Sequence, residues 1–125
     1  MANATAYEMI TARLSNYADK AVAKYQAVAI AADGRYTVAT GTALPFVGIC
    51  QYGEEDEDRM ITVVRGIFPG IAADEISAGD PVVATTGGKF VTATTGLVHG
   101  IALTAAGAAD ELVAIQILDT PFTLA

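Results

Sequence analysis

Short runs of apolar residues, alternating with polar ones and separated by turn residues, follow one another along most of this chain. AVAIA (27–31), RYTVA (35–39) and RMITVV (59–64) are rich in β-branched or aromatic residues, which favours strands. Asp33-Gly34 and Gly87-Gly88 separate such runs, and both pairs suit the positive φ of a hairpin turn. About eight evenly spaced strands are predicted, a number typical of an all-β sandwich or barrel.

The chain also repeats itself. DGRYTVAT (33–40) returns 54 positions later as GGKFVTAT (87–94), and the match extends in both directions. The two copies cover about residues 19–66 and 73–118, and the Pro and Gly of GIFPGIAAD between them indicate a connection. Two copies are too few for a solenoid, which needs about three repeats to bury its faces. We therefore expect a mainly β fold, a small barrel or sandwich built from two duplicated halves.

The N-terminal segment has a different pattern. Its apolar residues recur at spacings of three and four, as on one face of an amphipathic helix. These residues are Tyr7, Ile10, Leu14, Tyr17, Ala21 and Tyr25. The spacing predicts a short helix over roughly residues 6–17, and divides the chain into an N-terminal arm or helix (1–18) and a single β domain (19–125). The arm either packs on its own domain or docks on a neighbouring subunit, and the sequence leaves both open.

Composition narrows the class of protein. Hydrophobic residues make up 53% of the chain and charged residues 17%, against about 25% charged in an ordinary soluble domain. No stretch approaches the roughly 20 apolar residues of a membrane span, so we expect no membrane partner. The apolar excess indicates a surface that another copy of the protein covers. A net charge of −7 argues against a nucleic-acid partner, because phosphate binding needs a basic face.

The N-terminus and the cysteine content indicate where the protein is made. The first residues lack the basic head and apolar run of a signal peptide. The single cysteine, Cys50, lies among apolar residues and is expected to be a buried, unreactive thiol. Both features fit synthesis in a reducing cytoplasm.

Candidate chemistry is sparse. The single histidine, His99, aligns with Val47 in the first copy, so the duplicated scaffold does not require a base there. Without a second His or Cys beside it, a zinc site is not expected. The acidic run 54–59 lacks the ligand order of a calcium loop and is interpreted as a solvated hairpin tip. We predict no catalytic, cofactor-binding or metal-binding residues, and therefore no enzyme.

The repeated motifs resemble those of a known family. A turn glycine is followed by RYTVA or KFVTA, then by VGI or HGI and an alternating strand, and SAGDPVV opens the second unit. This pattern, together with the richness in Ala, Thr and Gly and the absence of Trp, is similar to the small capsid decoration (cement) proteins of tailed bacteriophages, related to the lambda head decoration protein. The resemblance covers about residues 19–118.

The resemblance implies a structural virion protein, made in the host cytoplasm, that forms a homotrimer on the capsid exterior and binds the major capsid protein. It also implies that the N-terminal segment engages the shell, which makes Tyr7, Ile10, Leu14 and Tyr17 the candidate capsid-binding residues. The helical pattern of this segment departs from the extended arm that such families suggest. Two alternatives remain: another phage structural part, such as a tail-tube or head–tail joining protein, and a carbohydrate-binding adhesin module, disfavoured by the absence of Trp.

Overall fold

The mainly β fold is confirmed. The computed structural model describes residues 8–41, 44–53 and 60–124, and no α-helix occurs in these ranges. The strands are β1 (Met9–Tyr17), β2 (Ala27–Ile30), β3 (Tyr36–Val38), β4 (Phe46–Tyr52), β5 (Met60–Ile71), β6 (Pro81–Thr85), β7 (Lys89–Thr92), β8 (Gly96–Ala102) and β9 (Leu112–Leu124). The 3-10 turn η2 (Thr86–Gly88) joins β6 to β7.

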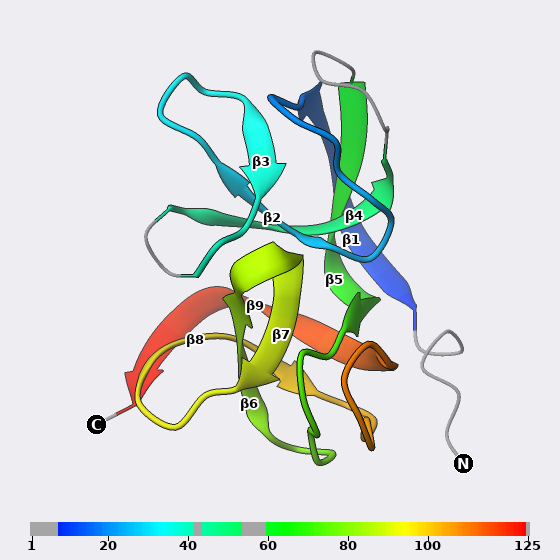
Figure 1. The fold of residues 1–125 in the computed structure, drawn as a ribbon, viewed down its shortest axis with the longest axis vertical. Coiled ribbons are helices and arrows are strands. Elements are labelled where there is room, and N and C mark those ends of the chain that lie inside the picture. The colour runs from blue at the N-terminus through cyan, green and yellow to red at the C-terminus, as the bar shows by residue number, and fades with distance from the viewer. Residues whose placement is uncertain (1–7, 42–43, 54–59, 125) are drawn as a thin grey trace.

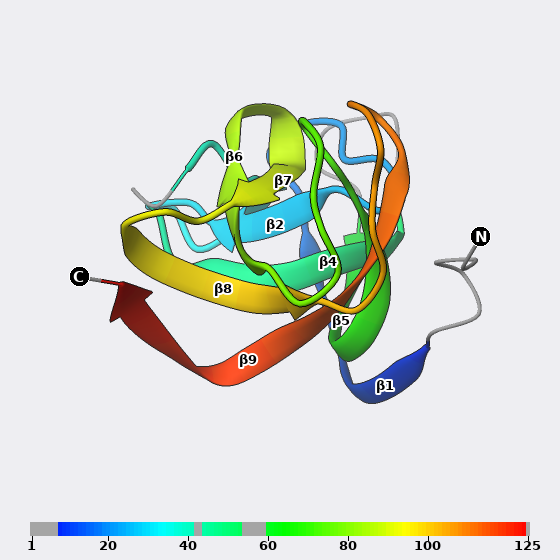
Figure 2. The ribbon, with the colours of Figure 1, turned by 90° about the horizontal axis from the view of Figure 1, so that it is seen from below.

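All nine strands belong to one curled antiparallel sheet. The strand order is β3-β2-β4-β5-β9-β8-β6-β7, and β1 pairs with β5 beside this path. Strands β1 to β4 lie together in the upper part of Figure 1 and β6 to β9 in the lower part, with β5 reaching from one to the other. The view from below shows the sheet curling, with β7 and β6 on one side and β9 on the other (Figure 2).

The two halves of the molecule are built on the same backbone scheme. A parallel bridge joins Ala18 to Tyr36, and a second parallel bridge joins Ala72 to Phe90. Each residue of the second bridge is numbered 54 higher than its counterpart in the first. Next to each bridge, the backbone N–H of the following residue donates a hydrogen bond to the carbonyl of the bridged aromatic residue. The N–H of Asp19 donates to Tyr36 at 3.0 Å, and the N–H of Ala73 donates to Phe90 at 2.8 Å. The strand order β3-β2-β4-β5-β1 of the first half recurs as β7-β6-β8-β9-β5 in the second.

Strand β5 serves both halves. Its first part pairs with β4 and β1, and Ile67 to Ile71 pair with β9. The pair Leu14–Val63 between β1 and β5 has its counterpart in the pair Phe68–Ile115 between β5 and β9. The end of β5 thus occupies the same position in the second half that β1 occupies in the first. One continuous strand running through both halves fixes their relative position.

Two expectations from the sequence are wrong. Residues 9–17, expected to be helical, form strand β1 along β5, where a bulge between Ile10 and Ala12 interrupts the alternation of side chains. The apolar residues of this strand do not share one face, since Ile10 lies opposite Gly66 and Leu14 opposite Val63, so their three- and four-residue spacing did not mark a helix. The expected connection GIFPGIAAD is largely the second part of β5, in which Pro69 lies opposite Ala114. Proline is tolerated there because this part of β5 has a ladder partner on one side only.

The buried side chains form two clusters. The smaller is the interior of the first half: Ala18, Val22, Val28, Tyr36, Val47, Cys50, Ile61 and Val63. The larger, which we call the main core, combines the interior of the second half with residues on the other side of the first half's sheet, including Ala27, Ala29, Ile49 and Val64. The ring of Phe46 also meets Phe90 edge-on at 6.1 Å between centroids. The first half therefore packs its outer sheet face against the second half.

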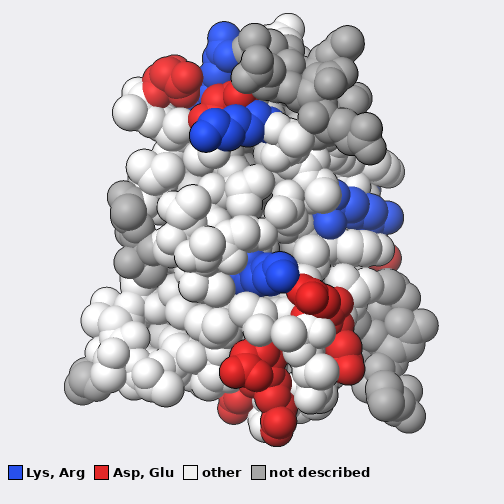
Figure 3. Space-filling model, viewed as in Figure 1, with Lys and Arg blue, Asp and Glu red and all other residues white. Residues whose placement is uncertain are grey.

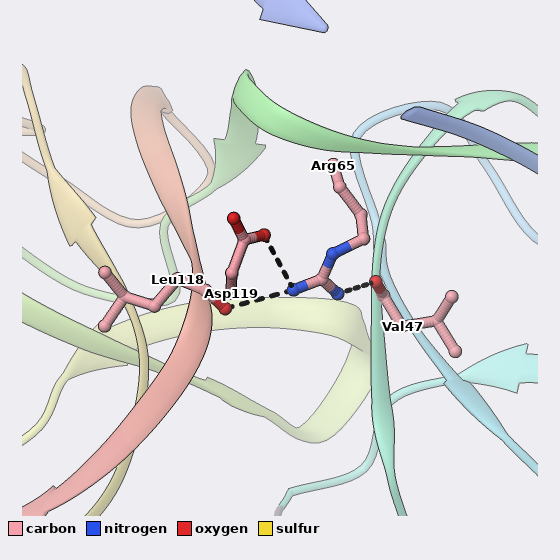
Figure 4. A network of polar contacts seen from close by, with 4 residues as sticks. All are labelled: Val47, Arg65, Leu118 and Asp119. Carbon is pink, nitrogen blue, oxygen red and sulfur yellow. Dashed lines mark hydrogen bonds and ion pairs between the residues drawn. The ribbon is translucent and has the colours of Figure 1, made fainter. Parts of the chain in front are cut away.

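Arg65 ties the halves together with polar contacts (Figure 4). From β5, its guanidinium donates through Nη1 to the carbonyl of Val47 in the first half and through Nη2 to that of Leu118 in the second, the latter at 3.0 Å. Asp119 lies 3.8 Å from Nη2. The side chain of Arg65 is 22% exposed and that of Asp119 is 89% exposed. The two carbonyl contacts therefore matter more than the ion pair.

Candidate functional site

His99 is a core residue. It is 2% exposed, and its ring stacks on Phe46 with centroids 4.4 Å apart. Its Nδ1 accepts a hydrogen bond of 3.1 Å from the N–H of Ala84, which requires this nitrogen to be unprotonated. Burial lowers the pKa of His99 from 6.5 to about 4. At neutral pH the imidazole is uncharged and its acceptor nitrogen is occupied, so it is poorly placed to act as a base.

The other candidate sites, the thiol of Cys50 and a metal-binding cluster, offer no reactive arrangement within the described residues. Cys50 is fully buried, and burial raises the pKa of its thiol to about 11. Within the ranges 8–41, 44–53 and 60–124, no group of three or more His, Cys, Asp or Glu side chains is arranged to hold a metal ion. The acidic run 54–59 lies outside the described residues. The same ranges contain no helix of the length and apolarity that crossing a bilayer demands.

His99 should make the fold sensitive to acid. Its pKa of about 4 in the folded chain lies below the ordinary 6.5, so the unfolded chain binds the extra proton first as pH falls. The stability is fully present above pH 6.5 and is lost progressively down to about pH 4. We expect His99 to account for roughly 3 kcal/mol of this loss. Urea unfolding at pH 7, 6, 5 and 4 measures it.

The control for this prediction is His99→Asn, which retains a hydrogen-bond acceptor but does not titrate. The variant should be less stable than the wild type at pH 7, because it loses the stacking on Phe46. Its stability should nevertheless fall less steeply between pH 6.5 and 4, since only the other ionisable groups respond. Equal slopes for the two proteins would contradict the assigned role of the histidine.

The predicted capsid-binding residues do not share one face. Tyr7 lies outside the described residues. Ile10 is partly buried against the main core. Leu14 is 40% exposed and lies opposite Val63, whereas Tyr17 is 52% exposed and lies opposite Met60. Since residues 60 and 63 of a strand point to opposite sides, Leu14 and Tyr17 do so as well.

Tyr17 belongs to a group that the sequence did not suggest. Met60 lies opposite Tyr17, and Tyr52 lies opposite Thr62, two residues further along β5. Tyr17, Tyr52 and Met60 therefore lie on the same sheet face, and they are 52%, 63% and 53% exposed. We call these three residues the tyrosine–methionine patch. Such side chains combine large apolar area with polar or adaptable ends, which suits protein recognition.

The face of the molecule drawn in Figure 3 is only sparsely charged. Figure 3 shows the Lys, Arg, Asp and Glu side chains gathered in a few places, with uncharged side chains between them. Lys89 and Asp110 form an ion pair at 2.5 Å. A surface of this kind offers protein contacts rather than a basic track for phosphate.

The sequence and the fold of this chain are both similar to those of known phage proteins. Residues 8–117 match the family model described as phage cement protein. Among curated proteins, no sequence matches the chain significantly. Among solved structures, the N base of the head fiber protein gp8.5 of bacteriophage phi29 is similar, with a TM-score of 0.68 and 19% sequence identity. The similarity covers 89% of this chain and 97% of that one, and at this identity it shows the shared fold alone.

The family match covers nearly all of the described residues, and it agrees with the resemblance carried by the repeated RYTVA and KFVTA motifs. It also agrees with the shortage of chemically reactive groups in the described structure. The chain belongs to the phage cement protein family and is a capsid-associated structural protein.

Proposed function

We propose that the protein binds the outer surface of a phage capsid as a trimer, contacts the major capsid protein, and stabilises the shell. Family membership supports the association with the capsid. The single structural observation that carries the proposed contact is the tyrosine–methionine patch, three large exposed side chains on one face of a fixed sheet. Exposed aromatic and methionine side chains are enriched at protein interfaces and often supply most of their binding energy.

The architecture suits a cementing role. A protein that clamps a shell needs a stiff body and contacts that repeat over the lattice, where many weak contacts reinforce one another. Strand β5 runs through both halves, and Arg65 bonds to a carbonyl in each of them. Stiffness of this kind lets a load applied to one half reach the other without opening a hinge.

The N-terminal segment, residues 1–16, is proposed to take part in the attachment. Of the four candidates Tyr7, Ile10, Leu14 and Tyr17, Ile10 packs on the main core and is poorly placed to meet a shell. Leu14 and Tyr17 have exposed side chains that sheet pairing with β5 holds in place. The contact is therefore proposed to combine strand side chains with the residues that precede β1.

A double substitution tests the proposed contact. Tyr17→Ser with Met60→Ser removes most of the patch without touching either buried cluster, so the fold should persist. We expect binding to heads that lack the protein to weaken at least about tenfold, as for the loss of interface anchors. Co-sedimentation with purified heads measures the affinity. The control is Ile30→Ser, which replaces an apolar residue, 38% exposed, outside the patch. If the double variant binds heads as tightly as the wild type, the tyrosine–methionine patch takes no part in the contact.

Shell stabilisation is tested separately. Heads that lack the protein should rupture at a lower temperature than heads to which it has been added back. If both preparations rupture at the same temperature, the protein binds without cementing. Rings of higher order that stack into tubes would instead favour a tail component, and a specific signal on a glycan array would favour an adhesin.

A further inference from the structure

The hairpin formed by β6 and β7 touches the first half at its tip. The N–H of Gly88 donates to the carbonyl of Ala39 at 3.0 Å. Nε2 of Gln26 donates to the carbonyl of Gly87, also at 3.0 Å. A Cβ added to Gly88, which is buried, would lie 2.9 Å from side-chain carbons of Gln26 and Val38. The tip of the hairpin therefore lies directly on the first half, and Figure 1 shows this turn just below β2.

The same hairpin is held to its own half by an unusual contact. Strand β6 pairs with β8 through only two residue pairs, Pro81–Ile101 and Val82–Gly100. Beyond them, the N–H of Ala84 donates to Nδ1 of His99 at 3.1 Å. A side chain thus takes the place that a backbone carbonyl ordinarily has in a ladder.

The first half shows which group His99 replaces. The equivalent pairs between β2 and β4 are Ala27–Ile49 and Val28–Gly48. Ile30, the counterpart of Ala84, donates its N–H to the carbonyl of Pro45 at 3.0 Å. The imidazole therefore supplies the acceptor that a loop carbonyl supplies in the first half. A carbonyl does not titrate, whereas an imidazole can.

His99 also lies at the contact between the two halves. Its ring stacks on Phe46 of β4 with centroids 4.4 Å apart, and Phe46 meets Phe90 of β7 edge-on. His99 is only 2% exposed. Protonation would place a charge in this apolar site and turn Nδ1 into a donor, so that it would face the N–H of Ala84. The ring of Phe46 can attract a cation, but it cannot replace the lost acceptor.

The charged groups on the surrounding strands are engaged elsewhere or exposed. Strands β4, β6 and β8 carry no Asp, Glu, Lys or Arg. Arg65 of β5 donates to two carbonyls, and Lys89 at the start of β7 is paired with a carboxylate. Asp119 of β9 is 89% exposed. The titratable residues of β4, Cys50 and Tyr52, lie in the smaller buried cluster and in the tyrosine–methionine patch. Burial, rather than a charged neighbour, is therefore the reason why the pKa of His99 is lowered.

From this geometry we infer that the β6–β7 hairpin is an acid-sensitive latch between the two halves. When His99 takes up a proton, the N–H of Ala84 loses its acceptor and the hairpin detaches from the first half. The ladder between β5 and β9 does not include this contact, so the two halves stay joined. The molecule is then stiff at neutral pH and jointed in mild acid. The inference goes beyond the proposed function and does not rest on it.

Thiol reactivity tests the latch. Ala84→Cys places a thiol on the hairpin at a main-core position that is 2% exposed, and it keeps the N–H. Cys50, which is 0% exposed inside the first half, reports opening of the whole chain. Dipyridyl disulfide, which reacts with thiols even in acid, is the probe, and each rate is divided by that of a free thiol at the same pH.

The two thiols should respond differently. From pH 7 to pH 5, the corrected rate at position 84 should rise about 20-fold, because the opened state binds the proton with the ordinary pKa of 6.5. At pH 5, Cys50 should react at least about tenfold more slowly than position 84, since it requires a larger opening. Simultaneous reaction of both thiols would overturn the inference, and so would a rate at position 84 that does not change with pH.

The control is the same thiol in a chain that also carries His99→Asn. The rise between pH 7 and pH 5 should then stay below about threefold, because the acceptor at this position no longer titrates. A full 20-fold rise in the control would assign the effect to other groups and contradict the latch.

Hydrogen exchange of the wild type provides a second readout if a variant fails to fold. At pH 5, the amides of Ala84 and Gly88 should be less protected than those of Val63 and Val64, which lie in the ladders of β5 with β1 and β4. Their exchange should also be nearly independent of low urea concentrations, as expected for a local opening that exposes little surface. Equal protection and equal urea dependence at all four amides would also overturn the inference.

Discussion

Gly66→Ala should destabilise the protein by at least about 3 kcal/mol, a large share of the stability of a domain of this size. Gly66 has φ of +109°, which side-chain-bearing residues rarely adopt. A Cβ added there would lie 2.1 Å from the carbonyl oxygen of Met9 on β1. Because backbone occupies that space, the added atom must push β1 away from β5. Urea unfolding at pH 7 measures the loss.

The matched control is Gly34→Ala. Gly34 also has a positive φ, +86°, but a Cβ added there meets nothing within 4 Å. This variant therefore bears the backbone strain alone, about 1 kcal/mol. The difference between the two variants isolates the close approach of β1 to β5. If both lose the same stability, β1 does not pack on β5 as described.

Arg65→Leu should cost about 2–3 kcal/mol. The substitution leaves the carbonyls of Val47 and Leu118 without the donor that now serves both. Hydrogen bonds to a charged donor contribute more than neutral ones, and water at this partly exposed site offsets part of the loss. Urea unfolding gives the total, and hydrogen exchange at the amides of β4 and β9 should rise on both sides of the lost contact.

Two variants separate the contributions around Arg65. Asp119→Asn should change the stability by less than about 0.5 kcal/mol, because the carboxylate is 89% exposed and 3.8 Å from the guanidinium. Arg65→Lys keeps the charge but cannot reach two carbonyls with a planar fork, so it should lose most of what Arg65→Leu loses. A stable Arg65→Lys variant, or a strongly destabilised Asp119→Asn variant, would show that charge rather than bridging geometry holds the halves.

The sequence predicted the strands well because their signals are local. The runs around Val28, Tyr36 and Val63 alternate and end at glycine-containing turns, and each is a strand in the structure. The burial of Cys50 also followed from its apolar neighbours. The core position of His99 did not follow, because its alignment with Val47 indicated only that the scaffold needs no base there, and the sequence suggested a loop or strand edge.

The role of β5 could not be predicted in the same way. A repeat alignment assigns each residue to one copy, whereas β5 ends the first half and begins the second. The match between residues 9–17 and 63–71 is almost invisible in sequence, since MITARLSNY and VVRGIFPGI share no identical position. Only the pairing registers reveal it. The tyrosine–methionine patch was missed for a related reason, because Tyr17, Tyr52 and Met60 come together only through β1–β5 and β4–β5 pairing.

Cryo-electron microscopy of emptied phage heads mixed with the purified protein tests the central claim most directly. We expect density for the protein in groups of three on the outside of the shell, with the end that carries Tyr17, Tyr52 and Met60 against the major capsid protein. Density confined to the tail or to the inner surface of the shell, or bare heads at saturating protein concentration, would contradict it.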